Sequence, residues 1–217
     1  VHRRVEPRVR ADGSATQDPA SWWDAVSDGT RALVAAHPDA VAALAAVAVT
    51  GQWGSMVPVD EAGEAVGDCL LWMDTRGGDL ARRALGGRVS VEGFAPRTIL
   101  EFIRRSGGAP SLEGNDPFGH RLWIQHEEPD TYRRTARFIE PLDYLNARFT
   151  GRVAASQTSM LLSWLTDNRT LDPGTYDPTL LRLAGVDPAT LPPLVPTGST
   201  VGTVTDAVAA ELGLPSG

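Results

Sequence analysis

Hydrophobic residues in the first third of the chain occur in short runs that are typical of strands. Residues 45–49 form a small, apolar, β-leaning run that ends at a glycine-containing corner. Residues 56–59 and 64–66 flank the sequence Asp60-Glu61-Ala62-Gly63, which suits a hairpin turn. Residues 69–72 form another apolar run and predict a second buried strand. The pattern therefore predicts strand, loop, hairpin and strand in this order.

Helical signals dominate the rest of the chain. Asp18 followed by Pro19 predicts an N-cap and the first residue of a helix. Further helices are expected over residues 96–105, 117–126, 141–149, 178–183 and 206–212, and the last three are each closely followed by glycine. In the first of these five, Ile99, Leu100 and Ile103 are predicted to face inward.

Polar and aromatic side chains gather where two predicted strands end. Gln52, Trp53 and Gly54 follow the first strand, and Trp72, Asp74 and Arg76 follow the second. We expect neighbouring strand ends to bring these residues close together. A carboxylate accepts hydrogen bonds, a guanidinium donates them and an indole ring covers C–H bonds. The set therefore suits a ligand that is rich in hydroxyl groups.

These residues also have purely structural interpretations. Asp74 stands where the N-cap of a helix over residues 75–85 would be, and one carboxylate has lone pairs for both a backbone N–H and a ligand hydroxyl. Trp72 would pack in the core as the end of a buried strand. Gln52 would tie down its own loop, and Arg76 would form a surface salt bridge.

The motifs resemble those of the FGGY carbohydrate kinases, the family of xylulokinase, gluconokinase and glycerol kinase. The family pattern small-Gly-Gln-x-x-Gly is similar to Thr50-Gly51-Gln52-Trp53-Gly54, and Trp-x-Asp-x-Arg matches Trp72-Met73-Asp74-Thr75-Arg76. Further similarities follow in the family's order: Gln17-Asp18-Pro19 with Trp22-Trp23, then Pro117-Phe118-Gly119-His120-Arg121-Leu122-Trp123, Pro141-Leu142-Asp143-Tyr144-Leu145 through Gly151, and Leu191-Pro192-Pro193-Leu194 with Gly198 and Gly202.

The sequence departs from the family pattern at several positions. The closing glycine of the first motif, Gly54, comes one residue early. Trp53-Gly54-Ser55 stands where many xylulokinase-like members carry Met-His-Gly, so the identity of the sugar stays open. His120 stands where lysine is usual, and Thr16 replaces a glutamate.

The resemblance implies an α/β fold, namely a ribonuclease H-like (actin-like ATPase) domain that is incomplete at both ends. Residues 1–217 would be the central part of the sugar-binding N-terminal domain, with the ATP-binding C-terminal domain absent. The family's Asp-x-Gly-Thr phosphate loop would precede Val1, and its catalytic aspartate, in a Gly-Gly-x-Asp loop, would follow Gly217. ATP and Mg²⁺ would then serve the full-length parent, and this chain would hold no catalytic residue and no metal and would bind no cofactor strongly.

Composition narrows the function classes. The net charge of −7 argues against a general nucleic-acid or anionic-membrane role. All 20 basic residues are arginine, which excludes a P-loop and a Schiff-base lysine. Cys69 is expected to be a packed hydrophobe, and the four histidines lack the spacing of a metal site. No apolar run approaches the ~20 residues of a membrane span, so a cytoplasmic location is the expectation.

Three functional hypotheses follow. The first is a fragment of an ATP-dependent sugar or polyol kinase that carries part of the sugar site and is inactive alone. The second is a non-catalytic carbohydrate-binding module derived from a kinase, which tight and selective sugar binding by the isolated chain would favour. The third is a scaffolding or homodimerising remnant, because loss of the first strands of a sheet leaves an unpaired edge that promotes self-association.

Overall fold

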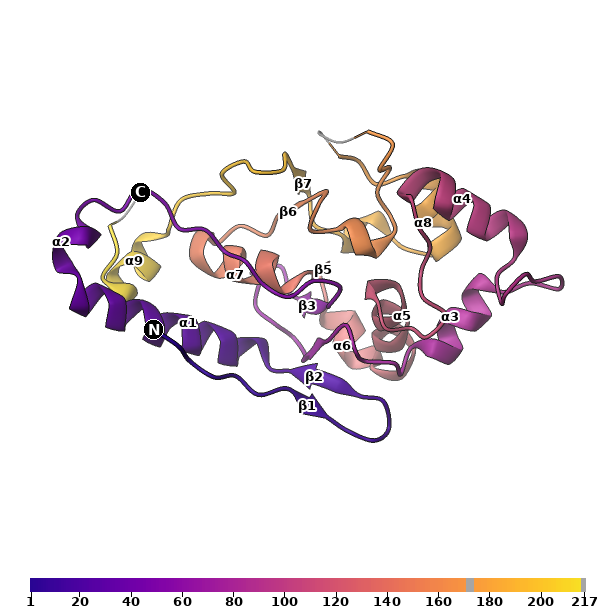
Figure 1. Ribbon diagram of the computed structural model, residues 1–217, viewed down its shortest axis with the longest axis horizontal. Helices are drawn as coiled ribbons and strands as arrows, with labels where there is room; N and C mark the ends of the chain where they lie inside the picture. The colour runs from indigo at the N-terminus through magenta and orange to yellow at the C-terminus, as the bar shows by residue number, and fades with distance from the viewer. Residues whose placement is uncertain (171–173, 216–217) are drawn as a thin grey trace.

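A computed structural model describes residues 1–170 and 174–215, which form an elongated molecule of helices around short strands (Figure 1). The helices are α1 (Pro19–Ala36), α2 (Pro38–Val41), α3 (Gly78–Leu85), α4 (Pro96–Ser106), α5 (Pro117–Glu127), α6 (Pro129–Arg134), α7 (Pro141–Thr150), α8 (Pro178–Ala184) and α9 (Asp206–Leu212), with 3-10 turns η1 (Leu161–Ser163) and η2 (Pro188–Thr190). The strands are β1 (Arg8–Val9), β2 (Ala15–Gln17), β3 (Val57–Val59), β4 (Cys69–Leu70), β5 (Arg137–Ile139), β6 (Ala155–Ser156) and β7 (Leu194–Val195).

The strands form three small sheets within the described residues. One has the order β1-β2-β4 and is antiparallel, with Thr16 opposite Leu70. Another pairs β3 with β5, with Pro58 opposite Phe138. A bridge between Met56 and Leu70 links the two sheets, and β6 pairs with β7 in parallel. The chain leaving β4 therefore lies beside the chain entering β3.

Sequence signals for the start of α1 and for the ends of α7, α8 and α9 are confirmed. The Asp18 carboxylate accepts a hydrogen bond from a first-turn amide (3.0 Å), and Pro19 is the first residue of α1. Gly151, Gly185 and Gly213 follow α7, α8 and α9 in the left-handed conformation, which costs a glycine little. Short-range capping chemistry was therefore readable from the sequence.

The expected hairpin is also present. Val59 pairs with Ala65 across the turn, and the Asp60 side chain accepts hydrogen bonds from two backbone N–H groups in it (2.9 and 3.0 Å). Gly63 reverses the chain at φ +82°. The turn holds the C-terminal end of β3 in place, and the loop that carries Trp53 enters β3 at its other end.

Residues 45–49 do not form the predicted strand. They have no backbone–backbone hydrogen bond to any described residue, and all but the partly buried Val49 are exposed. A β-leaning sequence becomes a strand only beside a partner that can complete its ladder of hydrogen bonds. Nothing in the described part of the chain lies alongside this run in that way, so its intrinsic preference stays unused.

The inward face of α4 also differs from the prediction. Of the three residues predicted to face inward, Ile99 is partly buried, but Leu100 and Ile103 are 61% and 51% exposed, while Phe102 is fully buried. The Phe102 ring packs edge-on against Phe118 of α5, with centroids 6.4 Å apart. Three apolar residues at helical spacing defined a face, but this single aromatic contact set which face turns inward.

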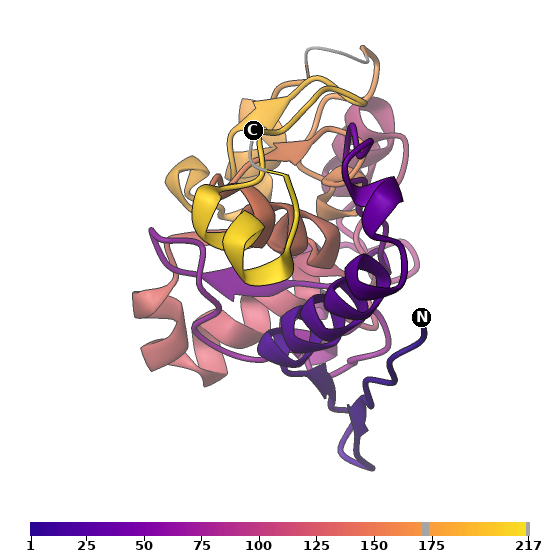
Figure 2. The ribbon, with the colours of Figure 1, turned by 90° about the vertical axis from the view of Figure 1, so that its left-hand side faces the viewer.

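Two core clusters lie on either side of residues 71–77. One fills the space among α3, α4, α5 and α8, with Leu85, Phe102, Phe118 and Leu180 at its centre. The other lies around β3 and β4, where Tyr144 of α7 joins it. Figure 2, which looks at the left-hand end of Figure 1, shows α9 beside α1. Residues 71–77, which connect β4 to α3, lie between the two clusters.

Three glycines bring the starts of α3 and α5 into backbone contact. A Cβ on Gly77 would lie 2.3 Å from the carbonyl oxygen of Gly119, and one on Gly119 would lie 2.3 Å from that of Gly114. A Cβ on Gly114 would lie 2.3 Å from the carbonyl carbon of Gly77. No side chain fits here, so the turn after Asp74 is held directly against α5.

Candidate functional site

Two exposed indoles flank the corner at Gly54. Trp53 is 43% exposed and Trp72 is 52% exposed. Trp53 Nε1 donates to the Ser159 carbonyl (3.0 Å), and the backbone N–H of Trp72 donates to Ser55 Oγ (3.1 Å). A Cβ on Gly54 would lie 3.7 Å from that of Trp72, so the two loops touch. The core-packing interpretation of Trp72 is therefore wrong: β4 ends in the core at Leu70, and the Trp72 side chain, two residues later, lies outside it.

Asp74 is fully buried and points toward β2. Its Oδ2 accepts from Ala15 N (2.9 Å) and Arg76 Nη2 (2.7 Å), and its Oδ1 accepts from Arg76 N (3.1 Å). The predicted helix N-cap at Asp74 is wrong, because α3 begins at Gly78 with Gly77 in the cap position. The carboxylate bonds a strand and a guanidinium instead of the first amides of a helix.

Arg76 is held on two sides. Its guanidinium pairs with Asp74, and its Cζ lies 4.7 Å from the centre of the Trp123 ring. The side chain is only 16% exposed. Arg76 does form a salt bridge, as the structural interpretation predicted, but the pair lies in the interior and not on the surface.

Gln52 faces a different part of the molecule. Its amide donates to Gln17 Oε1 (3.3 Å), which also accepts from Trp22 Nε1 (3.2 Å). The structure thus ties Gln52 to β2 and α1. Of the six candidate residues, it brings together Gly54 and Trp72 at one corner, with Trp53 next in the chain, and Asp74 and Arg76 in the adjoining turn.

Two buried carboxyl groups lie beneath the corner formed by Trp53, Gly54 and Trp72, which is called the tryptophan corner below. Glu140 is 2% exposed, and its two oxygens accept from the backbone N–H groups of Gly54 (3.2 Å) and Ser55 (3.1 Å). Asp143, 3% exposed, interacts with the Ser159 hydroxyl. Burial raises the pKa of Glu140 to about 9 and the pKa of Asp143 to about 7. Glu140 was not among the residues predicted from the sequence, because a glutamate before a helix-initiating proline is an ordinary feature of a surface helix.

His120 supports the Asp74 turn from α5. Its Nε2 lies 3.2 Å from the carbonyl oxygen of Asp74, which can only accept, so Nε2 carries the proton. Its Nδ1 is buried and has no hydrogen-bond partner among the described residues. Burial lowers the pKa of His120 to about 4. A neutral ring therefore stands where the family pattern has a lysine.

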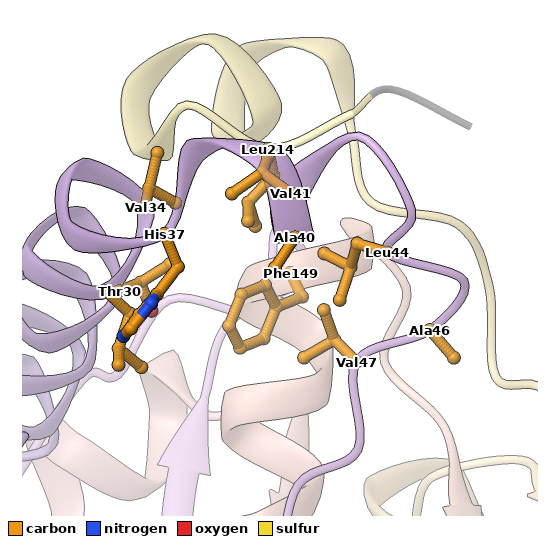
Figure 3. Close-up of a pocket in the computed structure, with 11 residues that line it drawn as sticks. Thr30, Val34, His37, Ala40, Val41, Leu44, Ala46, Val47, Phe149 and Leu214 are labelled. Carbon is orange, nitrogen blue, oxygen red and sulfur yellow. The ribbon is translucent and has the colours of Figure 1, made fainter.

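Two cavities show how little enclosed space the tryptophan corner offers a ligand. The pocket in Figure 3, of about 380 Å³, is lined almost entirely by apolar side chains of α1, α2 and residues 44–47, with Phe149 and Leu214. Such a lining offers a sugar few hydrogen bonds. A cavity of about 740 Å³ includes Gln52 in its wall, but neither it nor the Figure 3 pocket is lined by Trp53, Trp72 or Arg76. The candidate site is therefore an open surface.

Comparison with known proteins identifies the family. Residues 2–217 match the model of the N-terminal domain of the FGGY family of carbohydrate kinases. The chain belongs to the FGGY family. Xylulose kinase of Streptomyces coelicolor is 30% identical over 202 residues, which cover 92% of this chain and 38% of that protein. Xylulose kinase of Streptomyces rubiginosus is 31% identical over 203 residues, covering 91% and 38%.

Solved structures agree with this FGGY assignment. The crystal structure of xylulose kinase from Rhodospirillum rubrum matches with a TM-score of 0.82 at 26% identity, over 99% of this chain and 41% of that chain. Plasmodium falciparum glycerol kinase with ADP matches at a TM-score of 0.78 and 17% identity and shares the fold. The expected α/β, ribonuclease H-like (actin-like ATPase) fold is confirmed. The chain spans 38–41% of the length of these relatives.

A Mg²⁺ ion needs a cluster of oxygen ligands, which the described residues do not supply. Within residues 1–170 and 174–215, no three His, Cys, Asp or Glu side chains cluster so as to hold a metal ion. The chain also has no lysine. We therefore assign no step through ATP or Mg²⁺ to these residues.

No helix in the described part of the chain is both long and apolar enough to cross a bilayer.

Proposed function

We propose that this chain is the sugar-recognising part of an ATP-dependent kinase that acts on a ketose of the xylulose type. The two Streptomyces relatives are xylulose kinases. The observation that carries the proposal is the pair of indoles, each about half exposed, whose loops are fixed by hydrogen bonds to other parts of the chain. Flat aromatic surfaces held in place in this way suit the C–H faces of a sugar.

The proposed sugar site consists of Gln52, Trp53, Gly54, Trp72, Asp74 and Arg76, with different roles for its members. Trp53 and Trp72 would cover the carbon skeleton, and the buried Gly54 would form the turn between their loops at a positive φ. Arg76 would donate to hydroxyl groups through the part of its guanidinium that is not bound by Asp74. Asp74 is buried, so it would act by orienting Arg76, and Gln52 would act from the neighbouring side of the loop.

We further propose that residues 1–217 do not catalyse phosphoryl transfer alone. The transfer needs a base for the hydroxyl proton and Mg²⁺ on the phosphates. The described residues offer no cluster for the ion, and the tryptophan corner is open to water. The expected result is no ADP formation above background with ATP, Mg²⁺ and D-xylulose. Sugar-dependent ADP formation by the isolated chain would contradict this proposal.

The cytoplasm, which supplies ATP, is the proposed location.

Calorimetry tests the proposed sugar site. Binding of D-xylulose, D-gluconate and glycerol is compared in the wild-type chain and in Trp53→Ala and Trp72→Ala. We expect D-xylulose to bind, and each substitution to raise its Kd about tenfold, which corresponds to about 1.4 kcal/mol of lost contact. Leu100→Ala is the matched control, because it removes an exposed apolar side chain of α4. An unchanged Kd in both tryptophan variants would refute the site.

A carbohydrate-binding module derived from a kinase is the second candidate function. It is favoured by the same combination of anchored indoles and missing metal-binding groups among the described residues. A module should bind one sugar of the panel tightly and select it over the others. A kinase fragment should bind weakly, because residues beyond this chain would complete its site.

A further inference from the structure

A single buried carboxyl group connects the loops of both exposed tryptophans. Glu140 precedes α7, and each of its oxygens accepts one amide N–H, from Gly54 (3.2 Å) and from Ser55 (3.1 Å). The hydroxyl of Ser55, itself 1% exposed, accepts the backbone N–H of Trp72 (3.1 Å). Glu140 therefore fixes the backbone that follows Trp53 and, through Ser55, the backbone of Trp72.

The corner has few other ways to satisfy these amides. Residues 51–55 have no backbone–backbone hydrogen bond within the described chain, in contrast to Met56, which bonds Leu70. Buried amide groups without an acceptor are costly, so a two-oxygen acceptor is the element that makes this corner possible. Gly54 lies at φ +76°, a conformation that costs a glycine little, and a Cβ there would lie 3.1 Å from Leu162, so this turn needs a glycine.

We propose that Glu140 is a positioning residue of the sugar site: it sets the placement of the Trp53 and Trp72 rings without touching the sugar. The inference rests on the sugar-binding function proposed above. Glu140 lies beneath the corner and its two oxygens are both engaged, so its influence on a ligand passes through the backbone. The ligand class is a polyhydroxylated molecule whose C–H face lies on the two indoles.

Glu140→Gln is the decisive variant because it keeps the size of the side chain and removes one of the two acceptors. One of the amides of Gly54 and Ser55 would then face an NH₂ group. Ser55→Ala is the second variant, since it frees the Trp72 N–H and leaves Glu140 in place. Glu127→Gln, at the exposed end of α5, is the control for the same glutamate-to-glutamine replacement away from the corner.

Fluorine NMR of protein labelled with 5-fluorotryptophan reads the effect directly. The chain has six tryptophans, so six resonances can be assigned by single Trp→Phe substitutions. We expect Glu140→Gln to shift the resonances of Trp53 and Trp72 and to leave the other four in place. The Kd for D-xylulose should rise about fivefold to tenfold. Ser55→Ala should shift the Trp72 resonance most, and Glu127→Gln should shift none.

The outcomes separate this proposal from the function on which it rests. Unmoved Trp53 and Trp72 resonances in folded Glu140→Gln and Ser55→Ala proteins would overturn the positioning role. Equal shifts of all six resonances would also overturn it, because they would show a general loss of structure. If the two resonances move but the wild-type chain binds none of D-xylulose, D-gluconate and glycerol, the positioning of the rings stands and the sugar-binding function fails.

Discussion

Replacing Asp74 by alanine should be among the most damaging single changes to this chain. The carboxylate is fully buried, and it is the hydrogen-bond partner of Arg76 and of the backbone N–H of Ala15. Asp74→Ala therefore leaves a guanidinium that is 16% exposed without its counter-ion and a buried amide without an acceptor. Both losses belong to the folded state only, so they lower the free energy of unfolding.

The size of this effect follows from the geometry. Removing one partner of a buried ion pair costs about 3–5 kcal/mol, and the lower end applies because Arg76 stays partly solvated over the Trp123 ring. The orphaned Ala15 amide adds about 1 kcal/mol. The expected loss is thus about 4 kcal/mol, which lowers the Tm of a chain of this length by roughly 8–16 °C.

Urea unfolding at pH 7, followed by both far-UV circular dichroism and tryptophan fluorescence, measures the loss. Asp79→Ala is the matched control, because Asp79 also pairs with an arginine but its side chain is 81% exposed. That variant should lose less than about 1 kcal/mol. Equal shifts of the urea midpoint for the two variants would refute the reasoning that burial of Asp74 makes it important.

Three further predictions concern pH and packing. The pKa of Glu140 is raised from 4.5 to about 9 and that of Asp143 from 3.8 to about 7, so between these values the folded chain holds protons that the unfolded chain has released. Stability should therefore fall as the pH rises, to about pH 7 through Asp143 and on to about pH 9 through Glu140, and the fall between pH 7 and 9 should be absent in Glu140→Gln, measured by urea midpoints. The pKa of His120 is lowered to about 4, which has the opposite effect: the free energy of unfolding should fall as the pH falls from about 6.5 to 4, because the unfolded chain then binds a proton that the folded chain does not. His120→Gln should remove this part of the loss of stability in acid. Gly119→Ala should cost at least about 2 kcal/mol because its Cβ would lie 2.3 Å from a carbonyl oxygen, whereas Gly29→Ala, in the middle of α1 with its nearest neighbour at 3.8 Å, should gain about 0.5–1 kcal/mol; equal changes in Tm would contradict the packing argument.

Features set by neighbouring residues were predictable from the sequence. The cap at Asp18, the turn at Asp60 and the helix end at Gly151 each depend on interactions within a few residues, and the structure confirms all three. Residues 45–49 show the opposite case, since their preference for a strand needs a partner from a distant part of the chain. The face of α4 likewise depended on one long-range aromatic contact of Phe102.

The candidate site divides in the same way. The sequence indicated that the turn after β4 and the loop before β3 lie together, and the contact of Gly54 with Trp72 agrees with this. It did not reveal that Asp74 turns inward, because a carboxylate before a helix reads the same whether it caps that helix or pairs with a strand 59 residues away. Glu140, 85 residues from Ser55, gave no local signal either.

The glycine contact between Gly77, Gly114 and Gly119 joins the Asp74 turn to α5 through main-chain atoms alone. A side chain at such a junction would change rotamer and absorb a displacement, but peptide groups in van der Waals contact have no such freedom. The bond from His120 to the Asp74 carbonyl adds a second connection between the same two parts. If a ligand displaces the Trp72 ring, the turn and α5 should therefore move together. The displacement should then reach the core residues around Phe118 and not end in the loop.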